Sequence, residues 1–327
     1  MRIEIYTKSE ELPPLIKGSI LHSGLMFRTV EKRRGCKPLM LVGYDSKGCE
    51  MGHLLVTKRR SISLFPPMIN AAQYTINGEG VYRQGEEREK HFAVFLEHIL
   101  SMPGSNHTLI KVRNIEDSRF AYNTLRTHSF IPLRDQRLYI SLHNRPPKER
   151  LTRAYKAHIR KAEANGVTGR RATSPQEIAE GLSLLHNYYI SKTRRLPCKE
   201  ALHAMLHNND GTLSNEAQMF IVEHKGKIIG SSICLYEEGR ASLAFNCGLR
   251  KRHPLQYPGI MAIWTAVTDA HQRGYDHFEF LEARLLPYMH RKFIGTLLNY
   301  GGKLVGTLRW YRFRWEWINK ILRAIYV

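Results

Sequence analysis

The chain has 327 residues, a formal charge of +21 at pH 7 and a hydrophobic content of 43%. This length and composition support two domains with proper hydrophobic cores and exclude wholesale disorder. The excess of cations favours anionic partners, which means nucleic acid, anionic lipid or a phosphate-rich donor molecule.

Cysteines and apolar segments narrow the expected compartment. The five cysteines are scattered without a CxxC pair, which indicates a reducing compartment and neither a disulfide framework nor a zinc site. The first residues contain no apolar signal-peptide region, and no apolar run is long enough to span a bilayer. We therefore expect a cytoplasmic protein, with peripheral contact at the inner face of an anionic membrane left open.

The first half of the chain opens with a predicted hairpin. Residues 38–44 and 51–57 alternate as strands do, around an Asp-Ser-Lys-Gly turn. A helix is predicted over residues 86–100 and a strand over residues 108–113. The order is therefore strand, strand, helix, strand.

The second half repeats this order. A hairpin is predicted within residues 219–234, a helix over residues 259–272 and a strand over residues 277–281. Both hairpins carry the pattern Lys-Gly-x-x-x-Gly, formed by Lys47, Gly48, Gly52, Lys225, Gly226 and Gly230. The matching order predicts an internal duplication with domains at 1–147 and 148–327, divided at the His-Asn-Arg-Pro-Pro segment 143–147.

A basic helix is predicted between the two halves, over residues 150–167, with a stop at Gly166. One face is expected to pack, because apolar residues fall at helical spacing: Leu151, Ala154, Tyr155, Ile159 and Ala162. The rest of its surface carries cations: Arg150, Arg153, Lys156, Arg160 and Lys161. Two further helices follow, one capped by residues 173–175 and one that begins near Pro197. A cationic helix beside an interdomain cleft favours an anionic ligand.

The order of elements resembles the GNAT N-acyltransferase fold, and two copies in tandem resemble the FemAB family, whose enzymes build peptidoglycan cross-bridges. Three passages carry this resemblance. Residues 123–133 are similar to the family's helix–Gly-Phe–strand passage, with Ser129 in place of the glycine. Residues 155–167 are similar to its R-x-x-I-R-K-A-x-x-x-G-V helix, and residues 288–295 to its F-K-x-x-F-G passage.

The resemblance implies an α/β (α+β) fold of two GNAT-like domains, each with a mixed, largely antiparallel sheet flanked by helices. It also implies that the tail, residues 310–327, packs back on the first domain. The second domain is expected to bind the donor, acyl-CoA or aminoacyl-tRNA, with no tightly bound cofactor and no metal.

A donor site is expected at residues 256–261. GNAT proteins hold the donor's pyrophosphate at a helix start under a Gln/Arg-x-x-Gly-x-Gly/Ala signature, because unpaired N–H groups and the helix dipole attract anions there. In this chain Met261 stands where a small residue is expected. The donor-binding candidates are Arg250, Arg252, Gln256, Gly259 and Ile260, and the substrate-binding candidates on the basic helix are Arg160 and Lys156. The alternative is a plain strand-to-helix connection with solvated cations.

Acyl transfer to an amine needs a proton acceptor, a group that stabilises the carbonyl oxygen, and a proton for the leaving group. Strand alternation puts Glu279 and Glu282 on opposite faces, and Glu282, near the strand end, is the better candidate for the proton acceptor. Tyr288 is a candidate general acid and Arg284 a candidate clamp on the substrate. The alternative for either carboxylate is an ion pair with a neighbouring arginine.

The resemblance places Arg291 or Lys292 at the family's lysine, where a cation would neutralise negative charge that develops on the acyl carbonyl or the leaving ribose. The alternative is one cation on an exposed helix face.

The C-terminal segment interleaves aromatic and cationic residues from Arg309 to Trp317 and ends in an apolar stripe at helical spacing. Trp and Arg together suit a lipid headgroup interface or a nucleic-acid surface. We expect the stripe to close the core and the arginines to face an anion. The stripe consists of Trp317, Ile318, Ile321, Leu322 and Ile325.

Two functions stay open at this point. The first is a FemAB-like N-acyltransferase that transfers an acyl or aminoacyl group to a primary amine, with a cell-wall precursor as one candidate acceptor. Its mechanism would be direct attack, because the sequence contains no activated Ser or Cys motif. The second is a non-catalytic basic protein that binds RNA or anionic lipid on a relict GNAT scaffold.

Overall fold

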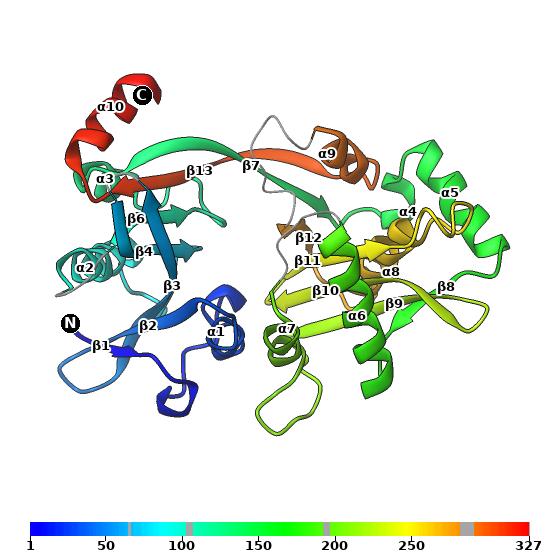
Figure 1. The fold of residues 1–327 in the computed structure, drawn as a ribbon, viewed down its shortest axis with the longest axis horizontal. Helices are drawn as coiled ribbons and strands as arrows, with labels where there is room; N and C mark the ends of the chain where they lie inside the picture. Colours follow the sequence, from blue (N-terminus) through cyan, green and yellow to red (C-terminus); the bar gives the residue numbers. More distant parts are fainter. Residues whose placement is uncertain (65–66, 103–106, 192–196, 282–290, 327) are drawn as a thin grey trace. The chain divides into compact units, whose positions relative to one another are not determined.

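The computed structural model describes residues 1–64, 67–102, 107–191, 197–281 and 291–326, which belong to two units (Figure 1). Unit 1 comprises Met1–Asp135 and Gly306–Val327, and unit 2 comprises Gln136–Val305. Strand β7 (Ile131–Ser141) and strand β13 (Lys303–Phe313) each pass from one unit into the other. The division therefore falls within β7 rather than at residue 147, and the tail after Val305 belongs to unit 1.

The sheet of unit 1 has the strand order β1-β2-β3-β4-β6-β13. Its other strands are β1 (Arg2–Tyr6), β2 (Cys36–Tyr44), β3 (Glu50–Leu64), β4 (Pro67–Asn77), β6 (His107–Arg113) and the short β5 (Val81–Tyr82), which pairs with β3. Its helices are η1 (Ser9–Glu11), η2 (Ile20–His22), α1 (Gly24–Glu31), α2 (Arg88–Ser101), α3 (Tyr122–Thr127) and α10 (Glu316–Tyr326). Strands β4 and β6 run parallel, on either side of α2 in the chain.

The sheet of unit 2 has the order β7-β12-β11-β10-β9-β8. Its strands after β7 are β8 (Thr168–Arg171), β9 (Ala217–His224), β10 (Lys227–Glu237), β11 (Arg240–Gly248) and β12 (His277–Phe280). Its helices are α4 (Pro147–Arg150), α5 (Arg153–Ala164), α6 (Pro175–Ser191), α7 (Lys199–Leu206), α8 (Pro258–Gln272) and α9 (Arg291–Leu298). Strands β11 and β12 are parallel and joined through α8. The predicted α/β class and the repeated order of elements are therefore confirmed.

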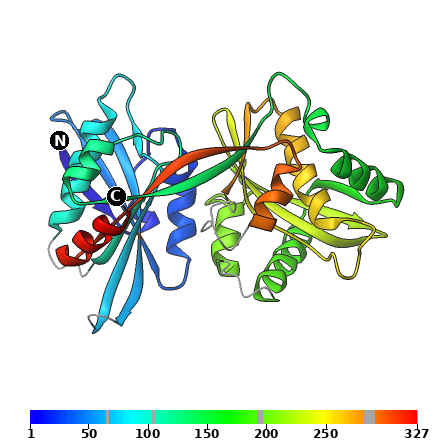
Figure 2. The same cartoon turned by 90° about the horizontal axis from the view of Figure 1, so that it is seen from above.

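Helices α6 and α8 cover opposite faces of the sheet of unit 2 (Figures 1 and 2). Phe220 and Val222 of β9 share a core with the buried residues of α8. Met219, on the other face, packs so closely on α6 that a Cβ added at Gly181 would lie 2.5 Å from its sulfur. Because both faces of β9 are covered, its sequence is a continuous apolar run rather than an alternating one.

The tail is an integral part of the core of unit 1. Trp310 of β13 is fully buried in one cluster with Phe92 and Phe95 of α2. The register pairs Trp310 with Val112 of β6. Packing of this large ring therefore fixes β13 beside β6.

The passage that resembles the family's helix–Gly-Phe–strand segment forms α3, a turn and β7, as predicted. Ser129 lies in the turn with a φ of +67°. Its N–H donates to Arg126 O (3.1 Å), and the N–H of Phe130 donates to Leu125 O (2.9 Å). Left-handed backbone favours glycine, so Ser129 adopts the conformation for which the family uses that residue.

The predicted basic helix is shorter than expected and is preceded by the separate turn of helix α4. Helix α5 ends in two bonds, from Gly166 N to Glu163 O (2.9 Å) and from Val167 N to Ala162 O (3.1 Å), with Gly166 at a φ of +74°. This Schellman motif is the stop predicted from Gly166. Ala154, which was expected on the packed face, is exposed, so that prediction is wrong.

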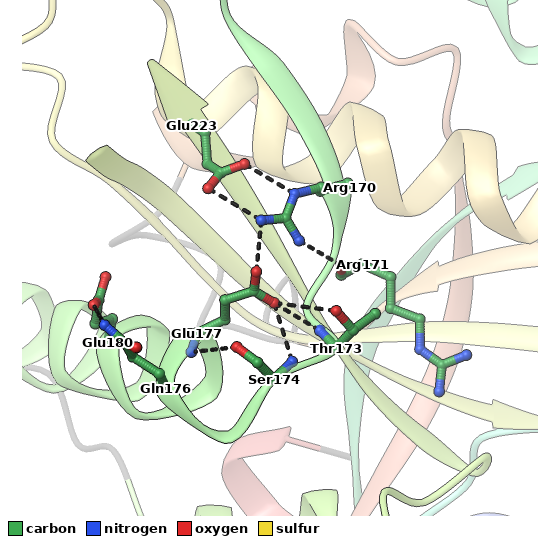
Figure 3. A network of polar contacts seen from close by, with 8 residues as sticks. All are labelled: Arg170, Arg171, Thr173, Ser174, Gln176, Glu177, Glu180 and Glu223. Carbon is green, nitrogen blue, oxygen red and sulfur yellow. Dashed lines mark hydrogen bonds and ion pairs between the residues drawn. The ribbon is translucent and has the colours of Figure 1, made fainter. Parts of the chain in front are cut away.

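A capping box starts α6, where the sequence predicts a cap (Figure 3). Glu177 N donates to the Ser174 hydroxyl (3.2 Å), and the Glu177 carboxylate accepts from Ser174 N (3.1 Å) and Thr173 N (2.8 Å). Arg170 joins this carboxylate to that of Glu223 with N–O distances of 2.6 and 2.9 Å. The Arg170 hydrogen bond, helped by the two backbone bonds, lowers the pKa of Glu177 to about 2.

We expect the ion pair of Glu177 to stabilise unit 2 only above acidic pH. Since folding lowers its pKa from 4.5 to about 2, the stabilisation is complete above pH 4.5 and is lost as the pH falls through about 2. The difference in unfolding free energy between the protein and Glu177→Gln, measured with urea, should shrink over this range. Glu180→Gln, the same charge change one turn along α6, is the control. Equal pH dependence in the two variants would contradict the assignment.

Two glycines let the start of α8 approach the sheet closely. A Cβ added at Gly248 of β11 would lie 2.2 Å from Gly259 N, and one added at Gly230 of β10 would lie 2.8 Å from Pro258 O. Gly230 is the second glycine of the repeated Lys-Gly-x-x-x-Gly pattern. Its counterpart in unit 1, Gly52, has a similar contact, 2.5 Å from Val81 O of β5. The repeated glycine therefore serves close backbone approach in both units.

Gly248→Ala is expected to lower the unfolding free energy by about 3 kcal/mol, because its methyl group would meet backbone atoms that cannot move aside. Gly295→Ala in α9 is the control. Nothing lies within 4 Å of a Cβ at that position, so this variant should gain about 0.5–1 kcal/mol. Urea denaturation measures both. Equal unfolding free energies of the two variants would contradict this, because α8 would then move away from the sheet without loss of stability.

The apolar stripe of the C-terminal segment forms a helix, α10, as predicted, but it does not close the core. Trp317, Ile321 and Ile325 are 49%, 52% and 65% exposed, whereas Asn319 is fully buried. The helix packs on the side that contains Asn319, which the sequence analysis did not anticipate. The prediction that the stripe packs inside is therefore wrong for these three residues.

Candidate functional site

The parallel strands β11 and β12 separate at their carboxyl ends. Their register runs from Arg240 and His277 to Leu243 and Phe280, where β12 ends. Beyond it, the pairing recorded among the described residues joins 245–248 of β11 to β10 alone. In α/β crossovers, ligands bind where the carboxyl ends of parallel strands part and the next helix begins. This region of unit 2 is the candidate site.

The first turn of α8 has one backbone N–H group without a recorded acceptor in the described part of the chain. Pro258 has none, and the N–H groups of Ile260 and Met261 donate to Tyr257 O (2.9 and 3.0 Å). The N–H of Gly259 has no acceptor among the described residues. Tyr257, the N-cap, has a φ of +46°, which is unusual for a bulky side chain and marks local backbone strain.

Three consecutive cations precede this helix. Arg250, Lys251 and Arg252 are exposed, and no ion pair is recorded for them within the described part of the chain. Bonds from Arg252 N and His253 N to Leu249 O (3.1 and 2.9 Å) hold them in a tight turn. An anion at the start of α8 would therefore meet the positive end of the helix dipole and three solvated cations.

Helix α5 packs against the segment that leads into α8. His158 stacks on Tyr257 with ring centroids 4.3 Å apart, and Asn165 Nδ2 donates to Leu255 O (3.2 Å). Burial raises the pKa of Tyr155 in α5, and the positive charge of Arg250 opposes that shift. Arg250 is therefore close enough to α5 to affect a side chain of that helix. The structure thus brings helix α5 and the cationic turn together.

The two predicted substrate-binding cations of α5 do not lie on this side of the helix. Lys156 and Arg160 each stand two residues from His158, which is about 200° around an α-helix. Arg160 is exposed, and Lys156 Nζ donates to Glu149 O (3.4 Å). They are therefore not gathered with Arg250 and the start of α8.

The end of α9 is fixed to the same region. The Tyr300 hydroxyl donates to Ile260 O (3.0 Å), and the Tyr300 ring meets Tyr155 edge-on at 5.0 Å. The N–H of Thr152 donates to Asn299 O (3.0 Å). These contacts orient the helix that begins with Arg291, although none of them was expected from the sequence.

The residues predicted to take part in the reaction lie partly or wholly outside the described residues. Arg291 and Lys292 form the first turn of α9, but their side chains lie outside the described part. Glu282, Arg284 and Tyr288 lie outside the described residues altogether.

Met261, which stands where the signature has a small residue, belongs to the core. Its side chain is 4% exposed and packs in the cluster beneath α8. The residues of the signature that remain partly accessible are Gln256, Tyr257, Gly259 and Ile260. The bulk of Met261 therefore takes no space at the start of the helix.

A buried ion pair joins β7 to β12 in unit 2. Both oxygens of the Glu279 carboxylate accept from Arg137, from Nε at 3.1 Å and from Nη2 at 3.0 Å. Glu279 is 1% exposed, whereas Phe278 and Phe280 face the core on the other side of β12. The alternation predicted for this strand is correct, and Glu279 has the ion-paired role that was the alternative to catalysis. Arg137 was missed, because nothing local in the sequence links residues 142 positions apart.

Arg137→Met is expected to cost about 3–5 kcal/mol of unfolding free energy, because it leaves a buried carboxylate without its cation. The double variant Arg137→Met/Glu279→Leu should recover most of this loss. Arg170→Met, which breaks a more exposed pair, is the control and should cost about 1 kcal/mol or less. Urea denaturation would contradict the assignment if the double variant were as unstable as Arg137→Met.

Among the described residues, no group of three or more His, Cys, Asp or Glu side chains is placed to hold a metal ion. No helix in the described ranges has the length and apolar character needed to cross a bilayer.

Comparison with known proteins now becomes informative. A protein-family model described as an acetyltransferase (GNAT) domain matches residues 149–288. The fold is similar to that of FemX over 99% of this chain and 100% of that chain, with a TM-score of 0.69 and 10% identity. No curated protein matched the sequence.

Two further solved structures are similar. The C-terminal domain of a putative lysylphosphatidylglycerol synthetase from Agrobacterium fabrum has a TM-score of 0.60 and 10% identity, over 91% of this chain and 90% of that chain. A tandem GNAT protein from the clavulanic acid biosynthesis pathway has a TM-score of 0.53 and 11% identity, over 95% of this chain and 98% of that chain. The chain thus has the tandem GNAT-like fold of FemX, and residues 149–288 match the acetyltransferase (GNAT) domain family.

Proposed function

We propose that this chain is an N-acyltransferase that moves an acyl or aminoacyl group from an anionic carrier to a primary amine. One observation carries the proposal. The residues that match the GNAT domain contain the whole β11–α8–β12 crossover, and three exposed cations, without an ion pair among the described residues, lie between β11 and α8. Acyl-CoA and aminoacyl-tRNA are the two carriers whose chemistry fits.

The carrier's phosphates would lie at the start of α8. The N–H of Gly259 and the helix dipole would hold one phosphate, and Arg250 and Arg252 would supply the remaining charge. Gln256, half-buried just before the helix, would contact the same group. The reactive carbonyl would then extend along β11 beyond Leu243, where β12 has ended.

The acceptor amine would attack this carbonyl directly. Glu282 would take its proton, Tyr288 would protonate the leaving group, and Arg284 would hold the substrate. Arg291 or Lys292 would stabilise charge on the carbonyl oxygen or the leaving group. Glu279 is not a candidate base, because Arg137 engages both of its oxygens.

The buried cysteines of unit 2 support a mechanism without a covalent intermediate. Burial raises the pKa of Cys234 well above its ordinary value and that of Cys247 to about 12. Both therefore stay thiols at neutral pH, and a thiol is a poor nucleophile compared with a thiolate.

The aminoacyl form of the proposal has some support from a structural neighbour named for the synthesis of lysylphosphatidylglycerol, an aminoacylated lipid. An amine on a cell-wall precursor is the proposed acceptor, with the cytoplasm as the proposed compartment. Arg160 and Lys156, exposed or half-exposed on the far side of α5, would bind the more distant parts of a large substrate.

Carrier binding is tested with the double variant Arg250→Ala/Arg252→Ala, titrated with CoA, acetyl-CoA and aminoacyl-tRNA. We expect affinity to fall about tenfold or more, because charge next to a phosphate is removed. Arg34→Ala/Lys37→Ala removes the same charge at exposed positions of unit 1 and should bind normally. Affinity for aminoacyl-tRNA should fall steeply with salt, and affinity for CoA much less. Equal affinity of the two double variants for the carrier would contradict a carrier-binding site at the start of α8.

Transfer itself is tested with Arg291→Ala/Lys292→Ala in an assay of acyl transfer to an amine. Lost transfer with retained carrier binding supports the assignment, and unchanged transfer contradicts it. Carrier binding by the unaltered protein without any transfer would favour the non-catalytic function instead.

A further inference from the structure

Helix α10 packs on its polar side. The Asn319 side chain, fully buried, accepts from Phe313 N (2.9 Å) and donates to Phe313 O (2.8 Å). These two bonds fix the helix to the end of β13 in unit 1. Trp317, Ile321 and Ile325 consequently project from the other side.

These three side chains form a continuous apolar ridge. They are spaced four residues apart, so they stand one above the other on a helix. Each is about half exposed or more, and together they are three of the ten large apolar side chains exposed among the described residues. Trp310 in the preceding strand is fully buried, whereas Trp317 of α10 is 49% exposed. The two tryptophans of this segment therefore have opposite environments. An exposed ridge of this kind marks an interaction surface.

Cations flank the ridge. Arg314, just before the helix, and Lys320, at its side, are exposed, and Arg323 is partly exposed. The one carboxylate of the helix is that of Glu316, in its first turn, which accepts from Asn319 Nδ2 (3.4 Å). A helix with Trp and Ile on one face and Lys and Arg beside them is suited to the boundary between headgroups and acyl chains of an anionic lipid layer.

Two other occupants fit this surface less well. A second copy of the chain would bring Arg314 and Lys320 against their own counterparts. Single-stranded nucleic acid needs aromatic faces on which bases stack, and Ile321 and Ile325 offer none.

We propose that α10 docks this protein onto an anionic lipid surface, with Trp317, Ile321 and Ile325 inserted among the headgroups and Arg314 and Lys320 at the lipid phosphates. The inference does not depend on the proposed acyl transfer. It concerns unit 1, whereas the candidate donor site lies in unit 2.

Cosedimentation with vesicles tests the proposal. The protein should bind vesicles of phosphatidylcholine that contain phosphatidylglycerol and should bind pure phosphatidylcholine at least about tenfold more weakly. The triple variant Trp317→Ser/Ile321→Ser/Ile325→Ser should lose about tenfold or more in affinity for the anionic vesicles. Ile190→Ser, at a 61% exposed isoleucine of α6 in unit 2, is the matched control and should bind as the unaltered protein does.

Each arm can overturn the proposal. Failure of the unaltered protein to bind anionic vesicles, equal binding of both vesicle types, or normal binding by the triple variant would do so. So would a triple variant that converts a dimer into a monomer while vesicle binding stays absent. Lys320→Glu, which leaves the ridge intact, should also weaken binding, and circular dichroism checks that all variants retain their helices.

Discussion

The contact between the start of α8 and strands β10 and β11 is the constraint on which the candidate site depends. It is a contact of backbone with backbone, made possible because Gly230 and Gly248 have no side chains. With the helix pressed onto the sheet, Tyr257 is held in a left-handed conformation and turns its ring onto His158 of α5. The cationic turn, the basic helix and the end of α9 all take their positions from this one approach.

The sequence predicts most of the elements, because the features that form them are local. Hairpin turns, the capping box at Ser174 and the Schellman stop at Gly166 each depend on residues a few positions apart. The duplication was visible for the same reason, since it repeats a short pattern whose second glycine has the same use in both units. Ser129 shows that a local conformation can persist even where the favoured residue is replaced.

The features that were missed depend on contacts between distant residues. Arg137 and Glu279 pair across 142 positions, and no local pattern reports such a partner. The direction of α10 was inverted, because hydrophobic periodicity locates an apolar face without saying what covers it. Here two hydrogen bonds from one buried asparagine decide which side packs. The burial of Met261 was missed for a similar reason, since a signature gives spacing along the chain and not the direction of a side chain.

The exchange of strands β7 and β13 between the units has a consequence for synthesis. Unit 1 needs β13 to bury Trp310, yet residues 136–302 of unit 2 are all made before that strand. On the ribosome, the front half of the chain must therefore wait with an incomplete sheet edge, which is the kind of exposed surface that promotes aggregation. A nascent chain of this protein has more need of a chaperone than its two-unit architecture would suggest.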